Sequence, residues 1–249
     1  KNRVYKRAFR NKMKRPNFKY LRSQRRKEFN DFLNFISNYS ISYQTAKFND
    51  ELPENHWGYT IIGLSIPVEP STLKHIRPQG ITNAKLLVDI EIVSDLGEWN
   101  NINDPFISLN FKAIIKAINP KSESPHFLAF HIDRHNGNNE TNEIHPLYHL
   151  QYLQNPKKKP DFNHGESLQL DIPRMMHFPM ELILGTSFLI SNFAPISYSK
   201  IIKDRQYVNL CKEYQERIWR PYINSLESYW SLTPNQWLWN PKLNCPYLI

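Results

Sequence analysis

A series of short segments with alternating polarity is the feature of this sequence that most constrains its fold. In residues 85–94, the apolar Leu86, Val88, Ile90 and Ile92 alternate with a second set of positions that includes Asp89 and Glu91 as well as Leu87 and Val93. A period of two residues is typical of a β-strand with one buried and one wetter face. Six such segments follow one another, at residues 57–66, 85–94, 106–118, 127–134, 146–153 and 167–172. Strands in direct succession predict an antiparallel meander, one face of which is partly free for function.

The third segment shows the same pattern in detail. Its polar positions include Ser108, Asn110 and Lys112, which are expected on the wetter face. Its expected core side consists of Ile107, Leu109, Phe111, Ala113 and Ile115.

Segments with helical spacing flank the strands. On the N-terminal side, an apolar stripe predicts a helix over residues 21–39 that packs on the core; the stripe consists of Phe29, Phe32, Leu33, Ile36 and Tyr39. On the C-terminal side, Pro179 is expected at the first position of a buried helix that runs through residues 180–193. A second helix is expected over 199–219 and a third after Pro221. The predicted fold class is therefore α+β, with an N-terminal helix, a sheet of five or six strands and C-terminal helices packed on one face.

Composition excludes several classes of protein. Seven glycines in 249 residues, with no glycine-rich loop between a strand and a helix, leave no candidate for a Rossmann or Walker nucleotide site. Two cysteines, Cys211 and Cys245, make a disulfide framework or a thiolate zinc site implausible. No run approaches the roughly 18 apolar residues of a membrane span, and no secretory leader is recognisable. We therefore expect a cytoplasmic protein without a membrane partner.

The charge is concentrated at the N-terminus. The net charge is +9, but residues 1–27 hold thirteen Lys or Arg and no acidic residue, so the other 222 residues hold 32 − 13 = 19 basic against 23 acidic side chains. This division predicts a basic arm at 1–27, one α+β domain at 28–232 and an aromatic tail at 233–249. We expect the tail to dock on the domain or on another subunit.

Aromatic residues are interleaved with the cations of the arm, among them Tyr5 and Phe9. Cations that neutralise phosphates and rings that stack on bases suit contact with DNA or RNA. An acidic protein surface, anionic lipid or plain solvation would also accommodate such a segment. The candidate nucleic-acid-binding residues are Lys6, Arg7, Arg10, Lys12, Lys14, Arg15, Lys19, Arg22, Arg25 and Arg26.

A histidine cluster is the one constellation that could carry chemistry. His131, Asp133 and His135 project from one face of the fourth segment, and His145 and His149 share a face of the fifth. These five residues are the candidate metal ligands. With a symmetric hairpin loop, the expected partners across the strands are His131 with His149 and His135 with His145. Imidazoles and a carboxylate suit Zn, Mn or Fe, and such an ion could activate a hydrolytic nucleophile.

Three functions remain open on this basis. The leading interpretation is a nucleic-acid-associated subunit of an intracellular hetero-complex, and an amino-acid usage typical of AT-rich coding sequences is compatible with a bacterial, antiviral defence system. The second is a metal-dependent phosphodiester hydrolase in which His131, Asp133 and His149 are catalytic. The third is a non-catalytic scaffold that binds an acidic partner. The histidines themselves could also be hydrogen-bonded packing residues, or could bind a nucleotide or peptide without catalysis.

Overall fold

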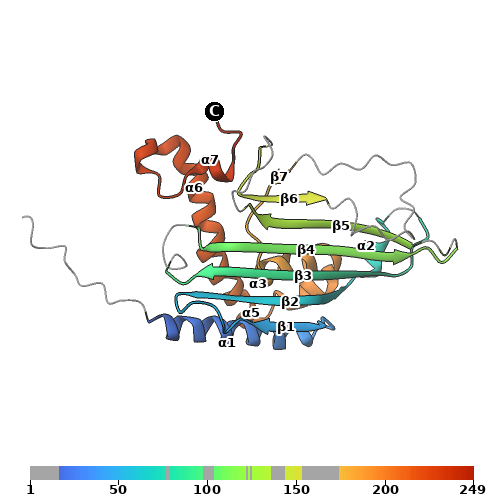
Figure 1. Ribbon diagram of the computed structural model, residues 1–249. Coiled ribbons are helices and arrows are strands. Elements are labelled where there is room, and N and C mark those ends of the chain that lie inside the picture. Colours follow the sequence, from blue (N-terminus) through green and yellow to red (C-terminus); the bar gives the residue numbers. More distant parts are fainter. Residues whose placement is uncertain are drawn as a thin grey trace, which may run out of the picture.

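Seven strands form one antiparallel sheet, and helices cover one of its faces (Figure 1). The computed structural model describes residues 17–76, 79–97, 104–121, 123, 125–135, 144–152 and 174–249. The strands are β1 (Thr45–Phe48), β2 (His56–Pro67), β3 (Ala84–Asp95), β4 (Phe106–Ile118), β5 (Pro125–Arg134), β6 (Tyr148–Tyr152) and β7 (Met175–Met176). Each strand pairs with its neighbours in sequence, so the sheet is a simple meander.

The helices are placed before and after the strands, apart from one short helix in the β2–β3 connection. They are α1 (Phe18–Ser37), α2 (Pro70–Leu73), α3 (Leu182–Phe193), α4 (Pro195–Ile201), α5 (Arg205–Tyr214), α6 (Arg220–Ser231) and α7 (Pro241–Asn244). A π-helical turn, Gln215–Trp219, joins α5 to α6, and a short 3-10 helix, Pro234–Gln236, follows α6. Within the described residues, each helix is too short or too polar to cross a lipid bilayer.

The α+β prediction is confirmed, and the described residues form seven strands where about five or six were predicted. The two additional strands are β1, with four residues, and β7, with only two, and neither is long enough to show a period in the sequence. The strand predicted at 167–172 lies outside the described residues.

A register shift explains why one residue of β4 was placed on the wrong face. Val93 pairs with Ser108, but Ser94 pairs with Phe106, so β4 has one residue more than β3 at this point. Such a bulge inverts the alternation locally. Phe106 is therefore buried, whereas Ile107, which was expected in the core, is 43% exposed.

Several helices, among them α1 and α3, begin where a side chain accepts their first amide hydrogens. Asn17 caps α1, which starts three residues before the predicted helix. This helix buries Phe29, Phe32, Leu33 and Ile36 of the predicted stripe and ends at Ser37, before Tyr39. Glu181 caps α3 by accepting hydrogen bonds from the next helical amides, so Pro179 precedes the helix rather than opening it.

The helix predicted over 199–219 is divided in the structure. It ends as α4 at Ile201, and Asp204 then caps α5 by accepting from the amides of Gln206 and Tyr207. The sequence prediction missed this break because it followed apolar spacing and did not consider the capping side chain.

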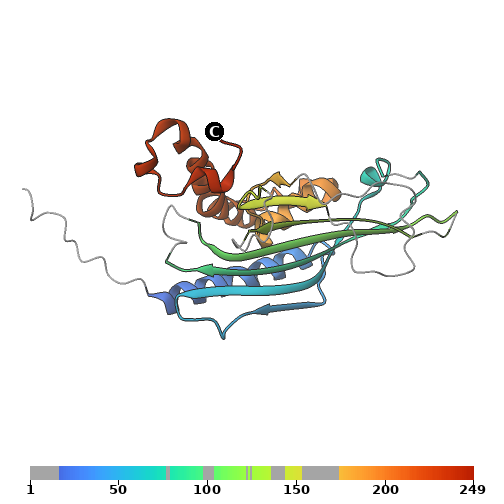
Figure 2. The same cartoon turned by 45° about the horizontal axis from the view of Figure 1, so that its top comes forward.

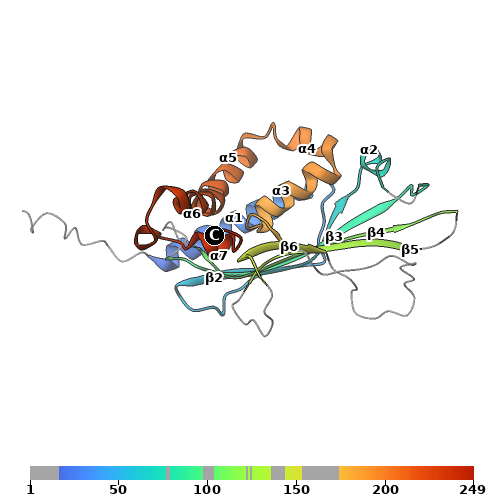
Figure 3. The same cartoon turned by 90° about the horizontal axis from the view of Figure 1, so that it is seen from above.

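The core lies between the sheet and the helices, which gather on one side in the view from above (Figure 3). The turned view in Figure 2 shows the long strands β2 to β5 running beneath them. The C-terminal tail docks on this layer: the Trp239 side chain is 6% exposed, and its ring lies 6.5 Å from that of Tyr148 and 6.0 Å from that of Tyr222. The opposite, outer face of the sheet carries the alternate residues of the strands, among them Lys112 and Lys116 but also the exposed Ile118.

Candidate metal centre

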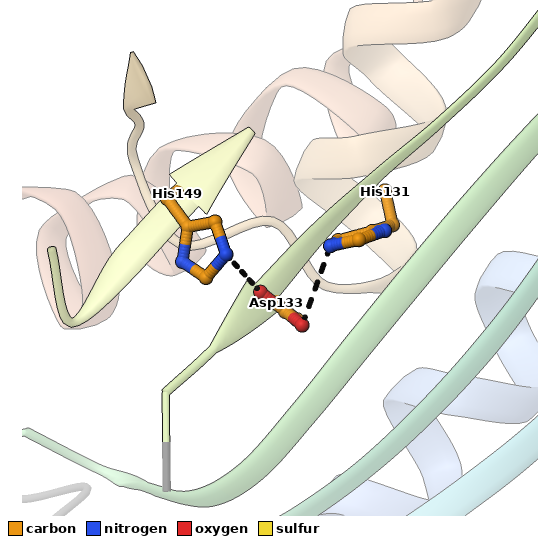
Figure 4. A group of neighbouring side chains, drawn as sticks. All are labelled: His131, Asp133 and His149. Atoms are coloured by element: carbon orange, nitrogen blue, oxygen red, sulfur yellow. Dashed lines mark ion pairs between the residues drawn. The ribbon is translucent and has the colours of Figure 1, made fainter. Parts of the chain in front are cut away.

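Two adjacent strands bring His131, Asp133 and His149 together on the outer face of the sheet (Figure 4). On β5, Phe130 and Ile132 are buried in the core, so the alternating His131 and Asp133 project to the other side. His149 of β6 pairs directly with Asp133. The site is thus built on regular strands rather than on loops, which holds its geometry firmly.

The Asp133 carboxylate lies between the two imidazoles. Its Oδ1 atom is 3.1 Å from Nε2 of His149, and its Oδ2 atom is 3.5 Å from Nε2 of His131. Ligand atoms of these three residues all lie within 4.8 Å of one another. Two imidazole nitrogens and one carboxylate oxygen at this spacing can share one divalent ion and leave coordination positions open to water or substrate.

The predicted cross-strand register is wrong by two residues, but the predicted face is right. Asp133, and not His131, pairs with His149, while His131 pairs with Gln151. The backbone N–H of His135 donates to the carbonyl of Leu147. Because side chains alternate with a period of two, a shift of two residues keeps every histidine on the same face. Residues 136–143, where the symmetric loop was assumed, lie outside the described residues.

One of the two histidines, His149, has a partner that leaves its Nε2 directed at the carboxylate, whereas Gln151 of the neighbouring strand pairs with His131. Nδ1 of His149 lies 3.3 Å from the carbonyl oxygen of Pro146. Partners of this kind fix the ring and the tautomer of metal-binding histidines. With the His149 proton on Nδ1, its Nε2 lone pair faces a carboxylate oxygen, an arrangement that a cation between the two atoms would stabilise.

Burial keeps both imidazoles neutral. Desolvation lowers the pKa of His149 from its usual value, although the charge of Asp133 opposes the shift. Desolvation also lowers the pKa of His131, with Asp133 opposing and the positive charges of Lys112 and Arg174 reinforcing it. Neutral imidazole is the form that binds metal ions. The Oδ1 atom of Asp133 is buried and accepts no hydrogen bond from the described residues, so the donor set fits a cation.

His135 and His145, the other two predicted ligands, lie beside the three-residue group. Their rings are stacked, with centroids 4.6 Å apart and an interplanar angle of 10°. The His145 ring is 5.6 Å from that of His149. Among the described residues, the group that brings three ligand atoms together is His131, Asp133 and His149. A ligand role for His135 and His145 stays a prediction.

A polar anchor on the core side holds the two strands that carry the site. Arg134 pairs with Tyr148 across β5 and β6, one residue from Asp133 and His149. Nε of Arg134 donates to Asp104 at 2.8 Å, and the Tyr148 hydroxyl donates to the same carboxylate. This anchor has no signature in the sequence, because Asp104 is 30 residues from Arg134 and belongs to no local pattern.

Two more residues at the site were also missed as functional candidates. Gln151 and Lys112 flank His131, one on each neighbouring strand, since β4 and β6 both pair with β5 at this position. Their alternation in the sequence placed both on the polar face. Only the register across three strands reveals that they are neighbours of His131.

The basic arm is described only from residue 17 onward, where it forms the start of α1. The predicted nucleic-acid contacts Lys6, Arg7, Arg10, Lys12, Lys14 and Arg15 lie outside the described residues. Of the others, Arg22 donates to backbone carbonyls of Leu52 and Pro53, and Arg26 pairs with Asp50. Arg25 is 4% exposed and pairs with Glu28 at 2.7 Å. Lys19 is exposed at the start of the helix. Nucleic-acid contact by these residues stays a prediction.

Comparison with known proteins gives no family: no protein family matches this chain, and no curated protein or solved structure shows significant similarity to it. The function therefore has to be argued from the site.

Proposed function

We propose that this chain is a divalent-metal-dependent phosphodiester hydrolase whose ion is held by His131, Asp133 and His149. The observation that carries the proposal is that ligand atoms of His131, Asp133 and His149 lie within 4.8 Å of one another, with Nε2 of each histidine beside the Asp133 carboxylate. A bound Zn²⁺ or Mn²⁺ would supply Lewis acidity, which polarises a phosphoryl oxygen and lowers the pKa of water.

The surroundings of the site favour an anionic substrate. Lys112 and Arg174 are close enough to His131 to lower its pKa through their positive charges. Hydrolysis adds water across a P–O ester bond: the water oxygen joins phosphorus, the ester oxygen leaves with the bonding electron pair, and the proton that water gives up ends on that oxygen. The groups of the protein bind the phosphate and orient it for this reaction.

The basic segment extends the proposal to nucleic acid as the substrate. Residues 1–27 contain thirteen basic side chains and no acidic one, which suits contact with the phosphates of DNA or RNA. Hydrolysis of DNA or RNA would use both the basic arm, which would bind the phosphates, and the histidine cluster, which would hold the ion. Membership of a larger assembly and a role in bacterial defence stay predictions, because the described surface carries no feature that specifies either.

The test is metal binding and hydrolysis in the intact chain and in His149→Ala. The intact protein should bind one equivalent of Zn²⁺ or Mn²⁺ and cleave labelled single-stranded or double-stranded DNA or RNA, and a chelator should remove the activity reversibly. His149→Ala should weaken ion binding by about 100-fold or more, since even outer-shell partners change metal affinity by 10–100-fold. His75→Ala, an exposed histidine on the turn after α2, is the matched control and should behave as the intact protein.

Two results would overturn the proposal in different ways. Failure of the intact chain to bind a stoichiometric ion would exclude the metal centre. Stoichiometric binding without cleavage of any of the nucleic acids would exclude the hydrolase and leave a nucleic-acid-associated subunit as the better account.

A further inference from the structure

Lys112 occupies the position next to the candidate metal centre on the neighbouring strand. In the pairing of β4 with β5, Lys112 lies directly opposite His131, so the two side chains share the outer face. Side chains in such pairs have Cβ atoms about 4.5–5.5 Å apart. A cation is therefore placed beside ligands that would themselves hold a cation.

No acidic side chain of the described residues forms an ion pair with Lys112. Its partner on the other side is Asp89 of β3, but no ion pair forms between them. Asp89 instead accepts a hydrogen bond of 2.8 Å from the backbone N–H of Gly63, at the bulge of β2 where φ is +65°. The Asp89 carboxylate is thus engaged by the β2 backbone and forms no ion pair with the Lys112 ammonium group.

A lysine next to a divalent ion is unfavourable unless an anion lies between them. Two positive centres a few ångströms apart repel each other, and a phosphate group that contacts both turns this repulsion into two attractions. Lys112 is half-buried, which strengthens such contacts relative to those in open solvent.

We propose that Lys112 is the substrate-binding residue that holds a non-bridging oxygen of the phosphate group at this site. This inference rests on the proposed function, which supplies the ion, and it adds the residue that selects a phosphate substrate. A lysine suits this role because its ammonium group acts as a compact point charge toward phosphate. The ion and Lys112 then hold the same phosphate group from two sides.

The experiment separates phosphate binding from ion binding in Lys112→Ala, Lys112→Arg and the control Lys116→Ala. Lys116 is on the same strand and the same face, about 13 Å further along at 3.3 Å per residue, and is exposed. Zn²⁺ and Mn²⁺ affinity is measured by competition with a chelating dye. Affinity of the ion-loaded full chain for inorganic phosphate is then measured by calorimetry at low and at high salt.

The expected changes have opposite signs for the two ligands. Lys112→Ala should bind the ion at least as tightly as the intact chain, because a repelling charge is gone, but should bind phosphate about tenfold more weakly at low salt. Lys112→Arg should stay within about threefold for phosphate, since it keeps the charge, and Lys116→Ala should match the intact chain. A variant that merely misfolds would lose ion and phosphate together.

Each outcome decides between the two proposals. Equal phosphate affinity in the intact chain and in Lys112→Ala, with the ion bound in both, overturns the role of Lys112 and leaves the metal centre standing. Phosphate binding that Lys116→Ala weakens as much as Lys112→Ala also overturns it, since the effect would then reflect only the general charge of the face. Absence of ion binding in the intact chain overturns the proposed function, and this inference with it.

Discussion

Glu181 is an ionisable side chain that the fold encloses completely. Its carboxylate accepts hydrogen bonds from the amides of Ile183 and Leu184 and from the Tyr59 hydroxyl, yet desolvation raises its pKa from 4.5 to about 7. The protonated form is therefore favoured in the folded state. The raised pKa of Glu181 adds about 3 kcal/mol to the free energy of unfolding at low pH, relative to high pH. This stabilisation is complete below pH 4.5 and is lost as the pH rises through about 7.

We predict that Glu181→Gln flattens this pH dependence, because glutamine resembles the protonated carboxyl group and does not ionise. Urea unfolding at pH 5, 6, 7 and 8 measures the free energy of unfolding of both chains. As the pH rises, the intact chain should lose stability relative to Glu181→Gln. Glu227→Gln, at an exposed position of α6, is the control and should follow the intact chain. Parallel curves for the intact chain and Glu181→Gln would contradict the prediction.

Single residues of the site differ in how far the sequence reveals them. His131, Asp133 and His149 were found because alternation along a strand fixes the face of each side chain without any knowledge of the fold. Gln151 and Lys112 were not found, because their position beside His131 depends on which residues lie opposite one another in neighbouring strands. That pairing is set by turns and bulges, whose geometry has no simple signature in this chain.

Among the elements, α3 makes a close contact with the sheet at Gly185. A Cβ atom at this position would lie 2.3 Å from Cε2 of Phe111 on β4, a distance that real Cβ contacts do not show. The glycine is thus required by the approach of the helix backbone to an aromatic ring, since both residues are buried.

Gly185→Ala should therefore destabilise the fold by about 1–3 kcal/mol, the usual cost of overpacking, although alanine is the better helix former. Denaturant unfolding measures the change. Asn192→Ala, on an exposed position of the same helix, should change stability by less than about 0.5 kcal/mol. A Gly185→Ala variant as stable as the intact chain would mean that α3 does not pack on β4 as described.

Element boundaries show where sequence reasoning succeeds and where it fails. The bounds of β4 were predicted correctly over thirteen residues, because its alternation is long and regular. The break between α4 and α5 was missed, because one capping side chain, Asp204, outweighs the continuing apolar pattern. The short edge strands β1 and β7 offer too few residues for any period to be read.

For the molecule as a whole, helix α1 runs across the predicted boundary between arm and domain at residue 27, which stays a prediction. Helix α1 starts at Phe18, and its buried Phe29 and the pair of Arg25 with Glu28 tie this segment to the core. Removing residues 1–27 would therefore take away half of a structural helix. Removing residues 1–16 leaves the helix intact and deletes eight of the thirteen basic side chains.

We predict that removal of residues 1–16 weakens binding to DNA or RNA. The slope of log affinity against log salt concentration should become shallower by about 0.7–0.9 for each phosphate that the shortened chain no longer neutralises. Fluorescence anisotropy over a salt series measures the affinity and this slope. A chain in which Lys203 and Lys212, exposed on the helical side, are changed to Gln is the control and should keep the slope. Equal slopes with and without residues 1–16 would make the segment a docking element for an acidic protein surface.

The location of the candidate metal centre has a mechanical consequence. Among the described residues, β6 has five residues and its outer neighbour β7 has two, so the pairing between strands is short at this edge of the sheet. An ion bound by His131 and Asp133 on β5 and by His149 on β6 would link these two strands at the edge of the sheet. Loss of the ion would then be coupled to separation of β6 from β5. The fraction of sites that hold an ion would determine how long the two strands stay paired.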